Sequence, residues 1–143
     1  MRRALLALAV GCSQDRPIAT CADDLGGIYV VEGAPAQRWH VIEPKPGALE
    51  AYPLFDDAPD SAIEVAPRVI DIERGDPPRG KVRRRYLQGP NACTATAPVT
   101  LTRCTGRTLE LVLGDPTPPL AFTPCTLGSP APSRRERWLR EPR

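Results

Sequence analysis

The chain has 143 residues, of which 41% are hydrophobic and 25% charged. This length fits one domain, and the apolar fraction is sufficient for a core, which argues against a disordered chain. The 18 prolines and 11 glycines indicate short elements joined by many turns. A formal net charge of only +2 excludes a strongly basic or acidic protein.

The first residues have the composition of an export signal. Arg2 and Arg3 form a short positive segment, and Ala4–Val10 is an unbroken apolar run of seven residues. A membrane-spanning helix needs about 20 apolar residues. A positive start, a short apolar run and small residues before a cut site are typical of a secretory signal.

The segment Ala9-Val10-Gly11-Cys12 resembles the lipobox of bacterial lipoproteins, although that family usually has leucine where Ala9 stands. The resemblance implies that residues 1–11 are a signal peptide and that Cys12 is acylated, which tethers the chain to membrane lipid in the cell envelope. Ser13 implies the outer membrane. The alternatives are an ordinary signal peptide of a periplasmic or secreted protein, or a misplaced start codon.

Beyond the signal, the composition predicts three further segments. Residues 12–20 are a polar tether, residues 21–127 a β-domain, and residues 128–143 a basic tail with five arginines and two glutamates. Without Arg2 and Arg3 the remaining chain is formally neutral, so residues 12–127 carry about −3. This balance argues against nucleic acid as a partner.

Short runs rich in β-branched and aromatic residues alternate with turn residues along the β-domain. Trp39 and Val41 share one face of their run, and Leu109, Leu111 and Leu113 share one face of the clearest alternating run. The pattern predicts strands over residues 24–31, 37–43, 49–55, 65–74, 81–87, 93–104 (interrupted at Pro98), 107–113 and 120–123.

The basic tail has a different pattern. Ser133 and Glu136 have the spacing of a capping box, in which the serine caps a helix start and the glutamate reaches back. We therefore expect a short helix over residues 134–140, with Trp138 on one side and Pro142 ending it.

About eight short strands at near-regular spacing predict an all-β fold, a small antiparallel up-and-down meander that closes into a barrel. Closure removes the two exposed edges of the sheet. A two-sheet β-sandwich is the alternative. Leu25-Gly26-Gly27-Ile28-Tyr29 faintly resembles the first-strand motif of lipocalins, with Tyr29 where that family has tryptophan.

If Cys12 carries lipid, the other four cysteines form an even set in an oxidising compartment, where disulfides are expected. Metal is the competing interpretation, but no pair has C-x-x-C spacing and His40 is the only histidine. Simple up-and-down alternation places Cys93 at the opposite sheet end from the other three. We prefer Cys21–Cys125 with Cys93–Cys104, the chain folding back at Ala97-Pro98; the other pairings stay open.

The sequence offers no convincing catalytic set. Nucleophilic catalysis needs a base beside the nucleophile, and His40 lies within a predicted strand, where a structural role is expected. Asp23-Asp24 and Asp56-Asp57 with Asp60 are adjacent carboxylates in loops, which does not predict a glycosidase pair or a calcium loop. We expect no enzyme activity, no metal and no cofactor.

One basic run lies within the β-domain. On a strand, Lys81, Arg83 and Arg85 share one face, which fits an anionic head group or an acidic envelope protein. The alternative is a solubilising strand exterior that discourages edge pairing.

The sequence thus predicts a cell-envelope lipoprotein with a disulfide-stapled β-domain that binds or scaffolds without catalysis. One alternative is a lipocalin-like carrier of a small apolar ligand. The other is an inhibitor of an envelope hydrolase, because periplasmic lysozyme inhibitors have a similar architecture.

Overall fold

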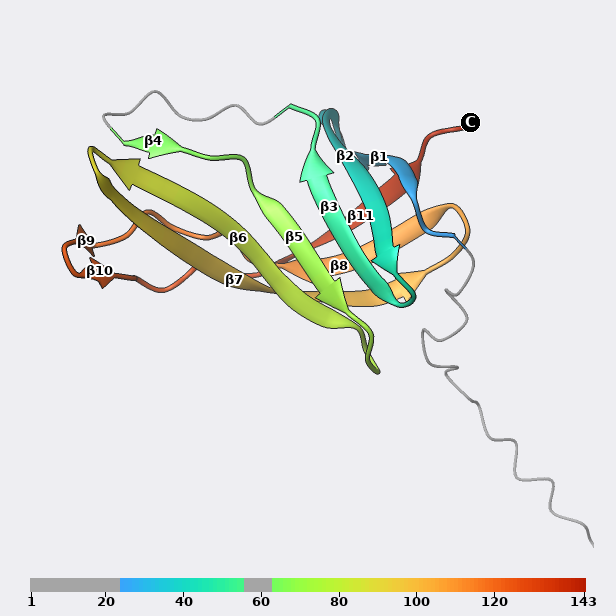
Figure 1. Ribbon diagram of the computed structural model, residues 1–143. Helices are drawn as coiled ribbons and strands as arrows, with labels where there is room; N and C mark the ends of the chain where they lie inside the picture. Colours follow the sequence, from blue (N-terminus) through green and yellow to red (C-terminus); the bar gives the residue numbers. More distant parts are fainter. Residues whose placement is uncertain (1–23, 56–62) are drawn as a thin grey trace, which may run out of the picture.

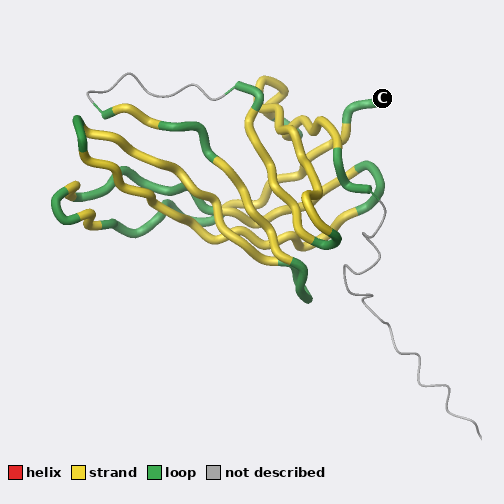
Figure 2. Tube along the Cα trace, viewed as in Figure 1, coloured by secondary structure: helices red, strands yellow, loops and turns green. Residues whose placement is uncertain are grey.

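The computed structural model describes residues 24–55 and 63–143, and every regular element in this part of the chain is a strand (Figures 1 and 2). No helix of these residues is long and apolar enough to cross a membrane. The strands are β1 (Gly27–Val31), β2 (Ala34–Lys45), β3 (Ala48–Pro53), β4 (Glu64–Val65), β5 (Val69–Glu73), β6 (Arg79–Gln88), β7 (Asn91–Cys104), β8 (Thr108–Leu113), β9 (Ala121–Phe122), β10 (Cys125–Thr126) and β11 (Arg134–Arg140).

Eight of these strands form a closed antiparallel barrel, as the sequence predicts. The order around the barrel is β1-β2-β3-β5-β6-β7-β8-β11, and β11 returns to pair with β1. Pairing of β6 with β7 over ten residue pairs joins the two flanks of the sheet. The two-residue strand β4 is an addition outside this ring, paired with β6. Because the sheet closes on itself, the barrel interpretation is confirmed over the sandwich.

The barrel interior is a continuous apolar core, since alternate residues of each strand point inward. Trp39, Val41, Leu109, Leu111 and Leu113 are all buried, which confirms the faces predicted for their strands. The Trp39 and Trp138 rings stack near-parallel, with centroids 4.9 Å apart and an interplanar angle of 15°. The other buried side chains of this cluster are Leu25, Tyr29, Val31, Leu49, Ala51, Ile70, Ile72, Val82, Ala97, Val99 and Leu101.

The predicted C-terminal helix is wrong. Residues 134–140 form strand β11, which lies between β1 and β8, so the barrel extends beyond the predicted boundary at residue 127. Glu136 does not cap a helix: its carboxylate accepts hydrogen bonds from Trp138 Nε1 at 2.8 Å and Arg134 Nε at 2.9 Å. Inward and outward side chains therefore alternate along β11 as in a strand, but the inward positions are largely polar.

The predicted interruption at Pro98 is also wrong, because β7 runs unbroken over 14 residues. The Pro98 carbonyl accepts a hydrogen bond from the Gly114 amide, so this residue faces the β8 side of the strand. Strand β8 ends opposite Val99. Proline has no amide hydrogen to donate, but beside Pro98 the strand β8 has already ended, so no ladder bond is lost and β7 continues unbroken.

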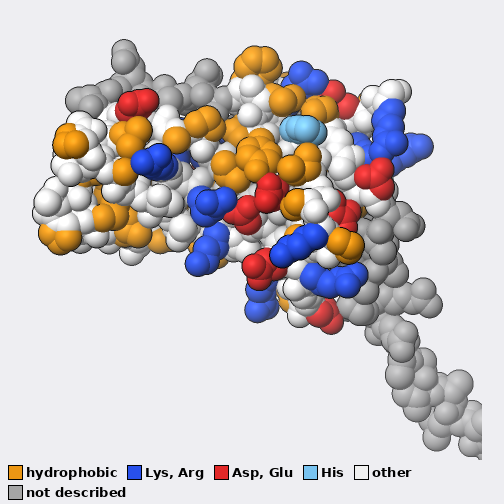
Figure 3. Space-filling view, in the orientation of Figure 1, with side chains coloured by type: hydrophobic (Ala, Val, Ile, Leu, Met, Phe, Trp, Pro, Cys, Tyr) orange, Lys and Arg blue, Asp and Glu red, His pale blue; other side chains and the backbone are white. Residues whose placement is uncertain are grey.

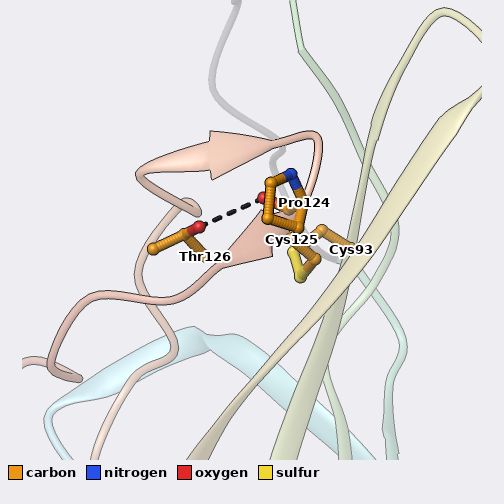
Figure 4. The surroundings of a disulfide bond; sticks show 4 residues. All are labelled: Cys93, Pro124, Cys125 and Thr126. Carbon is orange, nitrogen blue, oxygen red and sulfur yellow. Dashed lines mark hydrogen bonds between the residues drawn. A yellow bond between two sulfur atoms is a disulfide. The ribbon is translucent and has the colours of Figure 1, made fainter.

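Residues 114–133, which we call the arm, lie between β8 and β11 and hold the short hairpin of β9 and β10. Strand β8 has six residues and β7 has 14, so the chain leaving Leu113 continues toward the start of β7. There Cys125 is disulfide-bonded to Cys93, with Cα atoms 5.6 Å apart (Figure 4). The last predicted strand, residues 120–123, is reduced to β9.

This disulfide corrects the preferred pairing. Cys93 is bonded to Cys125, which excludes Cys93–Cys104 and Cys21–Cys125. The error follows from treating residues 120–123 as a full-length returning strand, which would have placed Cys125 at the far end of the sheet. Cys12 and Cys21 lie outside the described residues.

Antiparallel pairing gives the barrel two distinct ends (Figure 1). The Asp24 end holds the start of β1, the end of β11 and the β2–β3, β5–β6 and β7–β8 turns. The Cys93 end holds the β6–β7 turn and the arm. At about 3.3 Å per residue, β7 separates Cys93 from Cys104 by roughly 36 Å.

Candidate binding groove at the Asp24 end

The outer face of β6 carries the predicted basic residues. Lys81, Arg83 and Arg85 are exposed, whereas the intervening Val82 and the following Tyr86 are buried. The prediction that these three basic residues share one face is therefore confirmed.

A surface groove of about 660 Å³ lies beside this face, between the β2–β3 and β5–β6 turns. Lys81 and Arg83 line it, and Arg85 lies outside it. Figure 3 shows this side of the molecule, with acidic side chains lying between basic ones. The other lining residues are Pro44, Lys45, Ala48, Leu49, Glu50, Asp71, Ile72, Glu73, Arg79 and Gly80.

Glycine at position 80 allows the close approach of β5 and β6 beside the groove. A Cβ at Gly80 would lie 1.6 Å from the carbonyl oxygen of Asp71, so no larger residue fits without a backbone shift. The two turns that flank the groove also touch, because the Arg74 side chain packs over Gly47 at φ +81°. The groove is therefore formed by backbone geometry as well as by side chains.

The acidic residues of the groove are partly neutralised. Glu50 and Asp71 are directly opposite each other on β3 and β5, an arrangement that is unfavourable for like charges. Arg83 Nε donates to Asp71 Oδ2 at 2.5 Å, and the Tyr52 hydroxyl donates to Glu50 Oε2 at 2.6 Å. The hydrogen bond to Asp71 raises the pKa of Arg83, and the bond to Glu50 raises the pKa of Tyr52.

The remaining basic residues of the groove are less engaged. Lys45, Arg79 and Lys81 form no ion pair within 4.0 Å with any described acidic residue. Lys81 stands opposite Asp71 on one side and Pro98 on the other, and Arg79 stands opposite Glu73 and Thr100. These ammonium and guanidinium groups are available to an anion that enters the groove.

The part of the barrel interior around Trp138, by contrast, is closely packed by described side chains. The internal cavity between Val41, Ile70, Leu111 and Trp138 measures only about 10 Å³, which is about the space of one water molecule. No carrier pocket exists in this part of the core.

The other candidate residues are not brought into the groove. His40 lies exposed on β2, opposite Ile28 and Tyr52. Asp24 accepts a hydrogen bond from Arg143 at 2.6 Å, which lowers its pKa, with a smaller contribution from the Gly26 amide. Asp23, Asp56, Asp57 and Asp60 lie outside the described residues. Within residues 24–55 and 63–143, no three His, Cys, Asp or Glu side chains group closely enough to hold a metal.

The sequence did not identify Lys45, Glu50, Asp71 and Arg79 as members of the site. Their outward positions follow from strand alternation, but their proximity depends on β3 pairing with β5 and on the β2–β3 turn. Only the strand order brings them together.

No known family model matches the chain, and comparisons with curated proteins and with solved structures also find no match.

Proposed function

We propose that this chain is a lipid-anchored, non-catalytic binding module of the cell envelope, and that its groove binds the phosphate of anionic lipid head groups. One observation carries the proposal. The groove and Asp24, from which the chain leads back to Cys12, lie at the same end of the barrel. An acyl chain on Cys12 would hold this end near the membrane surface.

Charge at the Asp24 end fits this role. Residues 43–48, 73–81, 103–107 and 140–143 together with Asp24 hold eight basic and five acidic side chains. A basic residue near an anionic membrane contributes about 1 kcal/mol of binding free energy. One acyl chain gives only marginal anchoring, so a basic surface beside it strengthens attachment.

The close packing of the core around Trp138 supports a function on the outer surface. A lipocalin-like carrier needs a cavity of several hundred Å³, and the cavity in the core measures about 10 Å³. We therefore do not favour the carrier alternative, and the weak lipocalin resemblance of residues 25–29 carries no weight in the proposal.

The surroundings of His40 support a role without catalysis. The neighbours across the sheet are Ile28 and Tyr52, and within the described residues no hydrogen bond joins His40 to a carboxylate or hydroxyl. A general base requires such an orienting partner.

Vesicle flotation tests the groove. The full chain is used with Cys12→Ser, so that no acyl chain contributes, and its binding to phosphatidylglycerol vesicles is compared with phosphatidylcholine vesicles. We expect preference for the anionic vesicles, weakened by salt because exposed charges are screened. Lys81→Glu should reduce binding by at least about threefold.

Arg135→Glu is the matched control, because it makes the same charge change on the exposed face of β11, near the Cys93 end. Arg135→Glu should change binding to the anionic vesicles by less than about twofold. An equal loss of vesicle binding in Lys81→Glu and Arg135→Glu would contradict the proposal. Equal binding to phosphatidylglycerol and phosphatidylcholine vesicles would also contradict it. In that case an acidic envelope protein would be the partner to test on the same face.

A further inference from the structure

Among the residues that the structure describes, the Cys93 end carries few charges. Residues 86–102 and 116–133 contain no Asp, Glu, Lys or Arg at all. The Cys93–Cys125 disulfide joins these two segments, and the Tyr86 hydroxyl donates to the Pro116 carbonyl at 3.2 Å. Charged residues stand at the border of these segments, among the described residues Glu64, Arg85, Asp115, Arg134 and Arg135. Figure 3 shows this end, on the left, as mostly uncharged.

The arm at this end is held in one conformation by several contacts. Across its length, the Thr117 hydroxyl donates to the Ser129 carbonyl at 2.9 Å and the Leu120 amide to the Thr126 carbonyl at 2.8 Å. Residues 116–133 also contain six prolines. A segment already fixed by proline, hydrogen bonds and a disulfide loses little conformational entropy when it binds.

The arm exposes apolar side chains. Leu120 is 75% exposed and Leu127 46% exposed. Leu120 lies against Gly128, where a Cβ would come within 3.6 Å of its side chain. The arm thus carries two exposed leucines in a segment whose other residues are uncharged, and exposed apolar side chains of this kind are typical of a protein contact.

We propose that this uncharged end is the contact surface of a homodimer, in which the arm of one chain packs against the arm of a second copy. A two-fold interface places the same patch on both sides. Any charge near the axis then meets its own copy and is repelled. Two segments of 17 and 18 residues without charge, placed side by side, form a surface that meets itself without that cost.

The position of the arm separates the proposed contact from the groove. The arm lies at the barrel end opposite Asp24, so the contact leaves the groove free. The dimer does not depend on the ligand of the groove.

Sedimentation velocity of the full oxidised chain over a concentration series tests the dimer. We expect a reversible monomer–dimer equilibrium that Leu120→Asp weakens by at least about tenfold, because each dimer then holds two buried carboxylates. Leu139→Asp is the control: Leu139 is 39% exposed and stands opposite Thr108 near the Asp24 end, and its substitution should change the dissociation constant by less than about twofold.

A mixing experiment separates loss of contact from loss of fold. Leu120→Asp and Leu120→Lys should each be monomeric alone, and the equimolar mixture should recover a heterodimer through charge attraction. A wild-type chain that stays monomeric throughout, a dimer that Leu120→Asp leaves intact, or a mixture that shows no recovery would overturn the proposal. Binding of the arm to phosphatidylcholine vesicles without self-association would also overturn it. None of these outcomes bears on the groove.

Discussion

The indole rings of Trp39 and Trp138 stack 4.9 Å apart inside the barrel, although 99 residues separate them in the chain. Trp39 stands opposite Tyr29, and Trp138 stands opposite Val31, so the stacked pair covers the inner face of β1. Arg68 lies over the Trp39 ring at 5.3 Å and also donates to Asp115. The last strand is therefore joined to the second through the core.

Trp138→Ala should be among the most destabilising substitutions in this chain. The substitution removes the stacking partner of Trp39. It also leaves a buried cavity, because the Trp138 side chain is only 1% exposed. The free energy of unfolding should therefore fall by about 3–5 kcal/mol. Chemical denaturation followed by Trp39 fluorescence measures the change. The neighbouring Leu139→Ala, on the outer face, should cost less than about 1 kcal/mol, and comparable losses would show that β11 is not fixed through its inner face.

The tail shows why part of the fold was hidden from the sequence. Hydrophobic alternation identified the strands that place Val41 or Leu111 in the core. In β11 the inward residues include Arg134 and Glu136, and their charges are satisfied by each other and by Asp115 and Trp138. The inward positions of β11 do alternate, but Trp138 is the one apolar residue among Arg134, Glu136 and Trp138, so the capping-box spacing was misleading.

The site was partly predictable for a related reason. Alternation alone placed Lys81, Arg83 and Arg85 together on β6, but the groove needs partners from other strands. Those partners are brought in by the pairing of β3 with β5, which skips the two-residue strand β4. Pairing order is a long-range property that single-strand patterns do not encode.

The bond between Cys93 and Cys125 predicts the second disulfide. If Cys12 is acylated, Cys21 and Cys104 remain to pair. Arg140 donates to the carbonyls of both Asp24 and Gly106, so these two positions lie close together, three residues from Cys21 and two from Cys104. Peptide mapping without reduction should yield Cys21–Cys104 beside Cys93–Cys125. A Cys12–Cys104 peptide would contradict acylation of Cys12.

Stability at alkaline pH should depend on Tyr29. Burial raises the pKa of its hydroxyl, which donates to the Leu25 carbonyl at 2.9 Å. The unfolded chain releases this proton near pH 10, while the folded chain still holds it. The contribution of Tyr29 is therefore full below about pH 10 and is lost as pH rises further.

Denaturant midpoints at pH 8 and pH 11 measure this effect. Tyr29→Phe should lower stability at pH 8 by about 1 kcal/mol through the lost hydrogen bond, and it should show a smaller decrease between the two pH values than the unsubstituted chain. An unchanged decrease in the variant would assign the alkaline sensitivity to other groups.

Gly80→Ala should disrupt the groove. The added Cβ would overlap the Asp71 carbonyl, so β5 and β6 must separate, at a cost of at least about 1–3 kcal/mol. Gly106→Ala is the control, since a Cβ there meets nothing within 4 Å. Thermal unfolding of both variants, with vesicle flotation of each, should show loss of stability and of anionic binding for the Gly80 substitution only. Equal stability of the Gly80→Ala and Gly106→Ala variants would contradict the close approach of β5 and β6 at Gly80.

The roles proposed for the two ends of the barrel depend on an anchor at Cys12. Intact mass spectrometry of the protein recovered from its native membrane, reduced and unreduced, tests this most directly. We predict a chain that begins at Cys12, carries the added mass of acyl groups, and gains four hydrogens on reduction, for two disulfides. A chain that retains Met1 with an unmodified Cys12 would contradict it.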